Sequence, residues 1–220
     1  MEMIKGVLID FDGVISRSSV QNTIIFTHEY INRVQPIPYK FIENYIKLIL
    51  SFPVESSVAL LFDSLGLSSL IKDFYTKFND LDKDSSRIVI DEEFYQLINF
   101  LEKNDLDYRI LSLASKDRIK RIRNIDDSKI ANVGKSKADA GAFSNFIKDM
   151  NFFEWVQLDD SPIALRTGKL SGLTTVMMLN DIFTATDYRP FQQFIDYKTN
   201  SLAGFLKILK KLYIKKNNLL

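Results

Sequence analysis

Two pairs of carboxylates stand where an apolar run of the sequence ends. Asp10 and Asp12 follow the run at residues 7–9, and Asp159 and Asp160 follow a second run at residues 155–158. Side chains two residues apart in an extended chain point the same way, so Asp10 and Asp12 can converge on one ligand. Because burying an unpaired carboxylate is costly, we expect both pairs at the carboxyl ends of their strands, where open α/β sheets bind ligands.

A cation is the expected ligand of these acids. If the two strands are neighbours, the four carboxylates would repel one another strongly without a positive charge between them. All-oxygen ligands in the crevice of an open sheet favour Mg²⁺, which keeps part of its water and also binds substrate phosphate. The residues therefore predict a magnesium site.

Each pair also has a purely structural interpretation. Asp10 and Asp12, followed by Gly13, could be solvated acids in a strand-to-loop turn. Asp159 and Asp160 precede a helix start at Ser161-Pro162, and negative charge is favourable at a helix N-terminus, although one acid would suffice there.

A serine marks the end of a third apolar run. Ser115 follows residues 110–114, and its hydroxyl could donate to a phosphate oxygen beside the free amides of the next helix. Ser115 would equally serve as the N-cap of that helix, so both interpretations stay open.

The elements that must position these groups alternate between strand and helix after about residue 87, which is typical of parallel βαβ units. Before that point, residues 16–86 show helical periodicity and no convincing strand. We therefore predict a doubly wound α/β core from residues 1–15 and 87–220, with a helical cap inserted at 16–86. The expected strands are 7–9, 108–114, 130–133, 155–158 and 174–179, with a last one at 194–197; the expected helices are 19–34, 40–50, 53–65, 67–81, 91–103, 117–124, 139–150, 162–171 and 201–216.

Composition sets the outer bounds. The 220 residues are 46% hydrophobic and 26% charged with a net charge of +1, as in a soluble globular protein with no bulk attraction to nucleic acid or membrane. The absence of cysteine excludes disulfides, thiolate zinc sites and cysteine nucleophiles. No signal-peptide pattern and no apolar run of membrane-spanning length is present, so a cytoplasmic protein is expected.

Taken in order, these stretches resemble the haloacid dehalogenase superfamily of phosphatases and phosphomutases, from Ile4 to about Leu179. The Asp-Phe-Asp-Gly-Val run at residues 10–14 is similar to the first motif. Ser115 is similar to the serine of the second motif, with Ser112 as the alternative register.

The last two motifs are also recognisable. Lys137 looks like the lysine of the third, although Ala138 stands where relatives usually have proline, which leaves Lys135 as a rival. Asp159-Asp160, followed by the Gly-Leu-Thr-Thr-Val run at residues 172–176, resembles the acidic-pair form of the fourth motif and its trailing strand. The helical insertion looks like the cap of the β-phosphoglucomutase-like branch.

The resemblance implies a role for each residue. Asp10 would be the nucleophile that forms an aspartyl phosphate, and Asp12 the general acid and base. Mg²⁺ would be held by Asp10, the main-chain carbonyl of Asp12 and Asp160, with Asp159 in or near its coordination shell. Lys137 and Ser115 would contact the phosphoryl group.

The implied function is Mg²⁺-dependent hydrolysis of a small phosphorylated metabolite, which makes the protein a phosphoric monoester hydrolase with neither nucleic acid nor membrane as a partner. A sugar phosphomutase of the β-phosphoglucomutase type is the alternative enzyme. A phosphate-binding or interaction protein without turnover is the alternative from another class.

Three further features are expected to be structural. His28 is interpreted as a surface or packing residue, with a substrate role left open, and Arg118 and Lys120 as part of a solvated basic face, with an anion-binding patch as the alternative. The apolar stripe of residues 201–216 is expected to pack on its own sheet, with a membrane-surface helix as the alternative.

Overall fold

One parallel sheet forms the centre of the molecule. The computed structural model of the chain describes residues 4–52, 54–83, 89–113, 116–120, 122, 125–132, 136–139, 143 and 151–217. Within these residues six strands pair in parallel in the order β3-β2-β1-β4-β5-β6. The chain order reverses between β1 and β4, and an open sheet binds ligands at such a point. The strands are β1 (Gly6–Ile9), β2 (Asp107–Ser112), β3 (Ile130–Asn132), β4 (Trp155–Asp159), β5 (Thr174–Met178) and β6 (Tyr197–Thr199).

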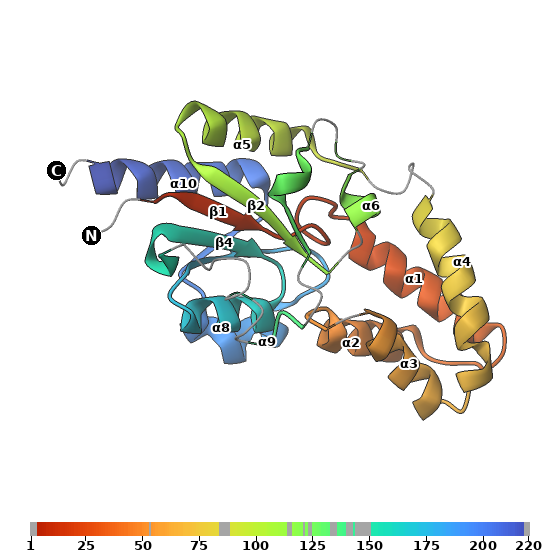
Figure 1. Ribbon diagram of the computed structural model, residues 1–220. Helices are drawn as coiled ribbons and strands as arrows, with labels where there is room; N and C mark the ends of the chain where they lie inside the picture. The colour runs from red at the N-terminus through yellow and green to blue at the C-terminus, as the bar shows by residue number, and fades with distance from the viewer. Residues whose placement is uncertain are drawn as a thin grey trace.

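Helices cover both faces of this sheet. Figure 1 shows α5 (Glu92–Lys103) and α10 (Leu202–Asn217) over one face and α8 (Pro162–Leu170) over the other. Val7 and Ile9 of β1 belong to the cluster that includes α5 and α10, whereas Leu8 packs with Trp155 in a second cluster. Successive side chains of a strand point to opposite faces, so the unbroken apolar run of β1 is what a strand covered on both faces requires. The predicted doubly wound α/β fold is confirmed.

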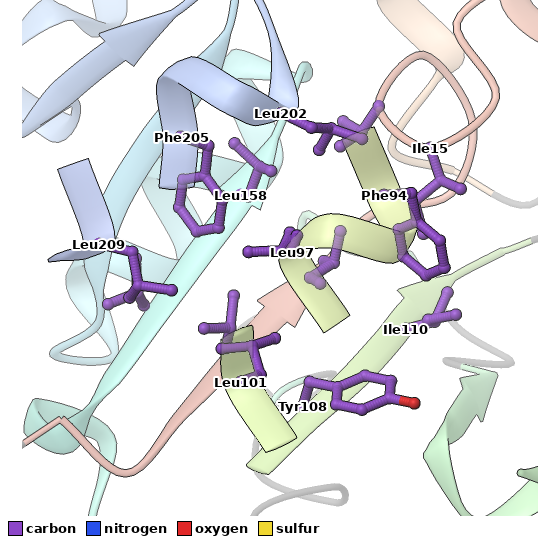
Figure 2. Close-up of a cluster of buried hydrophobic side chains, with 14 of the residues drawn as sticks. Ile15, Phe94, Leu97, Leu101, Tyr108, Ile110, Leu158, Leu202, Phe205 and Leu209 are labelled. Atoms are coloured by element: carbon purple, nitrogen blue, oxygen red, sulfur yellow. The ribbon is translucent and has the colours of Figure 1, made fainter. Parts of the chain in front are cut away.

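The C-terminal helix packs on its own sheet. Figure 2 shows α10 and α5 pointing their apolar side chains into one cluster above β1, β2 and β4. The residues of α10 recur at intervals of three and four, which places them on one side of the helix. The predicted packing of this stripe is therefore confirmed. The two helices contribute Phe94, Leu97, Leu101, Leu202, Phe205 and Leu209.

Among the described residues, four helices between β1 and α5 form what we call the helical layer. Figure 1 shows them beyond the carboxyl ends of β1 and β2. Their shared core includes Ile24, Ile42 and Phe74, and it continues into Leu165 and Met177 of the α/β part. The division of the chain at residues 16–86 stays a prediction. The helices are α1 (Ser19–Asn32), α2 (Tyr39–Ile49), α3 (Val54–Ser64) and α4 (Ile71–Lys83), with a 3₁₀ turn, η1 (Ser68–Leu70), before α4.

Two predicted elements differ from the structure. Within the described residues, the helix expected at 117–124 is α6 (Lys116–Ile119), followed by a turn at residue 120, while residues 121, 123 and 124 lie outside the described part. The last strand, expected at 194–197, is β6 (Tyr197–Thr199), because the 3₁₀ helix η5 (Arg189–Phe194), which follows α9 (Ala185–Tyr188), extends to Phe194. A capping box between Thr184 and Asp187 begins this helical stretch, which sequence periodicity did not indicate.

Other elements need only brief mention. Two short 3₁₀ helices, η3 (Asp127–Lys129) and η4 (Phe152–Glu154), lead into β3 and β4. The helix predicted at 139–150 falls largely outside the described residues. Among the described residues, no helix combines the length and the apolar character that crossing a membrane requires.

Candidate active site

Asp10 stands at the carboxyl end of β1, and its amide donates to the carbonyl of Leu158 in β4 at 2.9 Å. Its carboxylate is only 8% exposed. Oδ1 lies 2.6 Å from Nζ of Lys137 and accepts a hydrogen bond from the amide of Phe11 at 2.7 Å. A buried carboxylate is tolerated when it is paired and hydrogen-bonded, and both conditions hold here.

The loop after Asp10 turns back on itself. The amide of Ser16 donates to the carbonyl of Phe11 at 2.8 Å, and the amide of Gly13 donates to the carbonyl of Ser16 at 2.9 Å. Gly13 has a φ of +80°, and a Cβ there would lie 2.0 Å from Oδ2 of Asp160. Only glycine permits this approach of the loop to the second acid pair.

The second acid pair ends β4. Asp159 and Asp160 are almost fully buried. Oδ2 of Asp159 lies 3.0 Å from Nζ of Lys137, and its Oδ1 accepts from the amide of Ser161 at 2.9 Å. Oδ2 of Asp160 accepts from Nδ2 of Asn180 at 2.7 Å. Asp159 therefore also accepts a hydrogen bond at the start of α8, as its structural interpretation suggested. The hydrogen bond that Asp160 accepts comes from Asn180 and does not involve that helix start.

The structure brings three of the four acids together. One carboxylate oxygen from each of Asp10, Asp159 and Asp160 lies within 4.8 Å of the others. The side chain of Asp12 stands apart from this group. It is 26% exposed, and its Oδ1 lies 3.0 Å from Nη2 of Arg118.

Electrostatics show how much negative charge is concentrated here. Burial raises the pKa of Asp10 well above its usual range; Lys137 opposes this shift and the neighbouring acids add to it. Burial and the charge of Asp159 raise the pKa of Asp160 to about 8. Burial alone would lower the pKa of Lys137, but Asp10 and Asp159 raise it above its ordinary value.

This donor set fits a divalent cation. Among the described residues, Lys137 pairs with Asp10 and Asp159, while Asp160 has no cation within ion-pair distance, and the raised pKa of Asp160 reflects uncompensated negative charge. The donors are all oxygen atoms, the preferred ligands of Mg²⁺.

The lysine beside the acids is Lys137; its rival Lys135 lies outside the described residues, as does Ser115. Ala138, where relatives usually have proline, donates its amide to Oγ of Ser136 at 3.0 Å, and proline has no amide hydrogen to do this. Ser112, the alternative to Ser115, is buried at the end of β2 and lines the cavity described below.

Two polar residues at the site were not anticipated. Arg118 was expected on a solvated face, but its side chain is only 12% exposed, and its guanidinium lies over the ring of Phe11 at 5.7 Å. The feature of the sequence that could have indicated Arg118 as a site residue is its position in the short helix after β2. Asn180 comes soon after the end of β5, and a polar residue just after a strand is the same signal that identified the acid pairs.

A cavity of about 80 Å³ opens beside these groups. The α/β part contributes its charged and polar side chains, and the helical layer contributes mainly apolar ones. The lining consists of Asp10, Asp12, Ser112, Leu113, Arg118, Lys137 and Asp160 from one side and Ser19, Val20, Thr23, Ile46, Ile49, Leu50 and Phe78 from the other.

Ser51, just after α2, fastens the helical layer to the site. Its carbonyl accepts from the amide of Lys137 and from Oγ of Ser136, each at 2.8 Å. Its hydroxyl lies 2.6 Å from Oγ of Ser161, so the Ser161 side chain contacts Ser51 and makes no capping bond to α8. Residues that would bind the phosphoryl group and residues of the helical layer are therefore directly connected.

Lys47 makes a second connection. It is buried and pairs with Glu43 at 2.9 Å and with Asp187 of α9 at 3.2 Å. His28, by contrast, contacts the carbonyl of Ile37 at 3.0 Å and the ring of Tyr39, within the helical layer. It does not line the cavity, which agrees with a packing role.

Comparison with known proteins was made at the level of sequence and of structure. No family model matches the sequence, and no curated protein matches it. Solved structures do match. A β-phosphoglucomutase from Clostridium difficile has a TM-score of 0.66 at 16% identity, covering 97% of this chain and 99% of that chain. A hydrolase from Pseudomonas syringae has a TM-score of 0.72 at 15% identity, covering 94% and 98%.

The chain has the haloacid dehalogenase fold. An L-2-haloacid dehalogenase from Xanthobacter autotrophicus, solved with chloropropionic acid covalently bound, has it too, with a TM-score of 0.61 at 15% identity over 94% of this chain and 99% of that chain. At such identities the likeness concerns the fold alone. It confirms the resemblance of the sequence to the haloacid dehalogenase superfamily at that level.

Proposed function

We propose that this protein is a Mg²⁺-dependent phosphatase that hydrolyses a small phosphorylated metabolite through an aspartyl phosphate on Asp10. One observation carries the proposal. A buried carboxylate, held by a buried lysine, lies on the same cavity as a second, more exposed carboxylate two residues away. The first is suited to attack and the second to proton transfer.

In the first step Asp10 attacks the phosphorus atom and the ester bond to the alcohol oxygen breaks. The contacts from Lys137 and Phe11 both fall on Oδ1, so we assign the attack to Oδ2. Lys137 keeps its proton at neutral pH because its pKa is raised, and its charge favours the more negative transition state. Asp12 gives its proton to the leaving alcohol oxygen.

In the second step water attacks the aspartyl phosphate. Asp12 takes a proton from that water, and inorganic phosphate leaves as Asp10 is regenerated. The carboxylate of Asp12 is more exposed than that of Asp10, which allows it to reach both the alcohol and the water. Arg118 holds Asp12 toward the cavity.

The metal would be held by Asp10, Asp160 and the main-chain carbonyl of Asp12, with Asp159 beside them. When bound, Mg²⁺ supplies positive charge to the phosphoryl oxygens. Asn180 orients Asp160 through its hydrogen bond, and Lys137 orients Asp10 and Asp159 together. Ser115, or Ser112 in the alternative register, would donate to the phosphoryl group.

Dehalogenation is the reaction suggested by one structural neighbour, but a halide ion leaves without a proton. Asp12 would then have no role as an acid, although it lies on the cavity with Asp10. This argues for an ester oxygen as the leaving atom.

A substrate screen tests the proposal. The protein is incubated with Mg²⁺ and a panel of phosphate monoesters, with 2-chloropropionate in a parallel assay for chloride. Phosphate release that Asp10→Asn abolishes supports the phosphatase. Isomerisation that needs a bisphosphate identifies a phosphomutase, chloride release a dehalogenase, and tight phosphate binding without turnover a binding protein.

A further inference from the structure

The wall of the cavity formed by the helical layer is apolar. Val20 of α1 and Phe78 of α4 face the cavity together with three residues around the end of α2. Those three are Ile46, Ile49 and Leu50. In a phosphatase this wall would receive the alcohol part of the substrate, because the groups that would bind the phosphoryl lie on the opposite wall.

The hydroxyl groups of this wall already donate to the chain itself. Ser19 Oγ donates to the carbonyl of Ser16 at 2.7 Å, and Thr23 Oγ1 donates to the carbonyl of Ser19 at 3.0 Å. Each hydroxyl has one proton, so neither has another to offer a substrate in this arrangement. A substrate hydroxyl buried here could donate to these oxygens but would receive no hydrogen bond from them, so its bonds to water would be replaced only in part.

Positive charge is confined to the other wall. Among the described lining residues the cations are Lys137 and Arg118, and they contact Asp10 and Asp12 respectively. A second phosphate or a carboxylate on the substrate would therefore face apolar side chains, and burying an unpaired charge is costly.

The cavity is also small. Its volume of about 80 Å³ compares with roughly 300–1,000 Å³ for pockets that enclose a drug-sized ligand. With Ser51 and Lys47 fastening the helical layer in place, only a short group fits beside a phosphoryl.

On the basis of the phosphatase function, we propose that the substrate is a short phosphate monoester whose alcohol part is apolar and carries no second anionic group. This choice separates the protein from a phosphomutase, whose bisphosphate would need a second anion site. An apolar pocket discriminates against an added hydroxyl by about 10²-fold.

Three esters with the same number of carbon atoms test the proposal. Propyl phosphate is apolar, glycerol 1-phosphate adds two hydroxyls, and 1,3-propanediol bisphosphate adds a second anion. We expect kcat/KM for propyl phosphate to exceed that for glycerol 1-phosphate by about 10²-fold, and that for the bisphosphate by at least as much. Glycerol is the better leaving group, so this order would oppose intrinsic reactivity.

Two substitutions at one lining position sharpen the test. Leu50→Lys should raise kcat/KM for the bisphosphate relative to propyl phosphate by about tenfold or more, as expected for a new charge pair in a cavity. Leu50→Gln, which is milder for folding, should narrow the difference between propyl and glycerol phosphates. The matched control is Leu48→Lys in the last turn of α2, because Leu48 is 66% exposed and does not line the cavity.

The outcomes are separable. Equal or faster hydrolysis of glycerol 1-phosphate or the bisphosphate by the unsubstituted protein would overturn the substrate class and leave the phosphatase intact. So would two folded Leu50 variants with unchanged ratios. If no ester releases phosphate in an Asp10-dependent reaction, the proposed function fails and the substrate class fails with it.

Discussion

The two walls of the cavity differ in whether burying their side chains costs or gains free energy. The wall from the α/β part buries Asp10, Asp159 and Asp160 around Lys137, against the cost of removing charge from water. The wall from the helical layer buries Val20 and Ile46, whose burial is favourable in itself. Burying several carboxylates together is costly to folding, which favours a role in binding or chemistry, whereas the apolar wall can serve packing and substrate choice together.

Removing the metal should cause the largest loss of activity, because the metal would bind to the charged wall and not to the apolar wall. We expect excess EDTA to abolish phosphatase activity and added Mg²⁺ to restore it, because Asp10, Asp160 and the main-chain carbonyl of Asp12 would hold the ion, with Asp159 beside them. Ca²⁺ should substitute poorly, since its looser coordination would misplace the phosphoryl group. Full activity in excess EDTA would contradict the magnesium site.

Lys137 is the next point at which to break the charged wall. Lys137→Ala should lower kcat by about 10²–10³-fold, the usual cost of removing one group that stabilises transition-state charge. Lys135→Ala is the matched control and should leave kcat unchanged. The reverse result, with Lys135→Ala the inactive variant, would assign the third motif to the other lysine. Circular dichroism of both variants checks that they fold.

The contact between the two walls can be tested at Ser51. Ser51→Ala removes the hydroxyl contact with Ser161 and keeps both bonds to the Ser51 carbonyl. One such bond contributes about 0.5–1.5 kcal/mol, so we expect kcat/KM to fall by about 2- to 10-fold. Ser161→Ala should give a similar loss, and the double variant should lose little more, because the two changes remove one interaction.

Ser64→Ala is the control for this pair. Ser64 donates to the carbonyl of Leu61 within the helical layer and does not contact the α/β part in that bond. Its substitution should leave kcat/KM unchanged. Additive losses at Ser51 and Ser161 would show that their contact does not join the helical layer to the site.

The last predicted effect is on stability without metal. The pKa of Asp160 is about 8 in the folded protein, above the ordinary value near 3.8, so the folded state binds more protons than the unfolded state between these values. The contribution of Asp160 to the stability of the metal-free protein should be complete below pH 4, and it should be lost as the pH rises toward 8. The Tm measured in EDTA should therefore fall as the pH rises from 4 to 8, whereas a constant or rising Tm would contradict the prediction.

The sequence predicted the central part of the fold well because its signals are local. The apolar run of β1 ends at Asp10, and that of β4 ends at Asp159, so the strand ends and the acids could be read together. The helix α5 was expected to begin at Asp91, and the structure makes Asp91 its N-cap. Each of these features depends on a few neighbouring residues.

What the sequence did not predict depends on contacts between distant residues. Ser161 occupies the N-cap position of α8 as expected, but its hydroxyl contacts Ser51, 110 residues earlier. Arg118 was interpreted as solvated because its neighbours are basic, but α6 lies close enough to the loop after β1 for Arg118 to reach Asp12. No pattern of neighbouring residues in the sequence indicates either of these contacts.

The central claim is that Asp10 is the nucleophile and Asp12 the acid and base. Rapid acid quench after mixing with labelled phosphate ester tests it directly. In Asp12→Asn, attack by Asp10 is still allowed while proton transfer is lost, typically about 10²–10⁴-fold in rate, so the phosphoryl enzyme should accumulate, most clearly with a nitrophenyl ester that leaves without a proton. We predict label on Asp10 in Asp12→Asn and none in Asp10→Asn. Covalent label in Asp10→Asn, or equal residual turnover in both variants, would contradict the account.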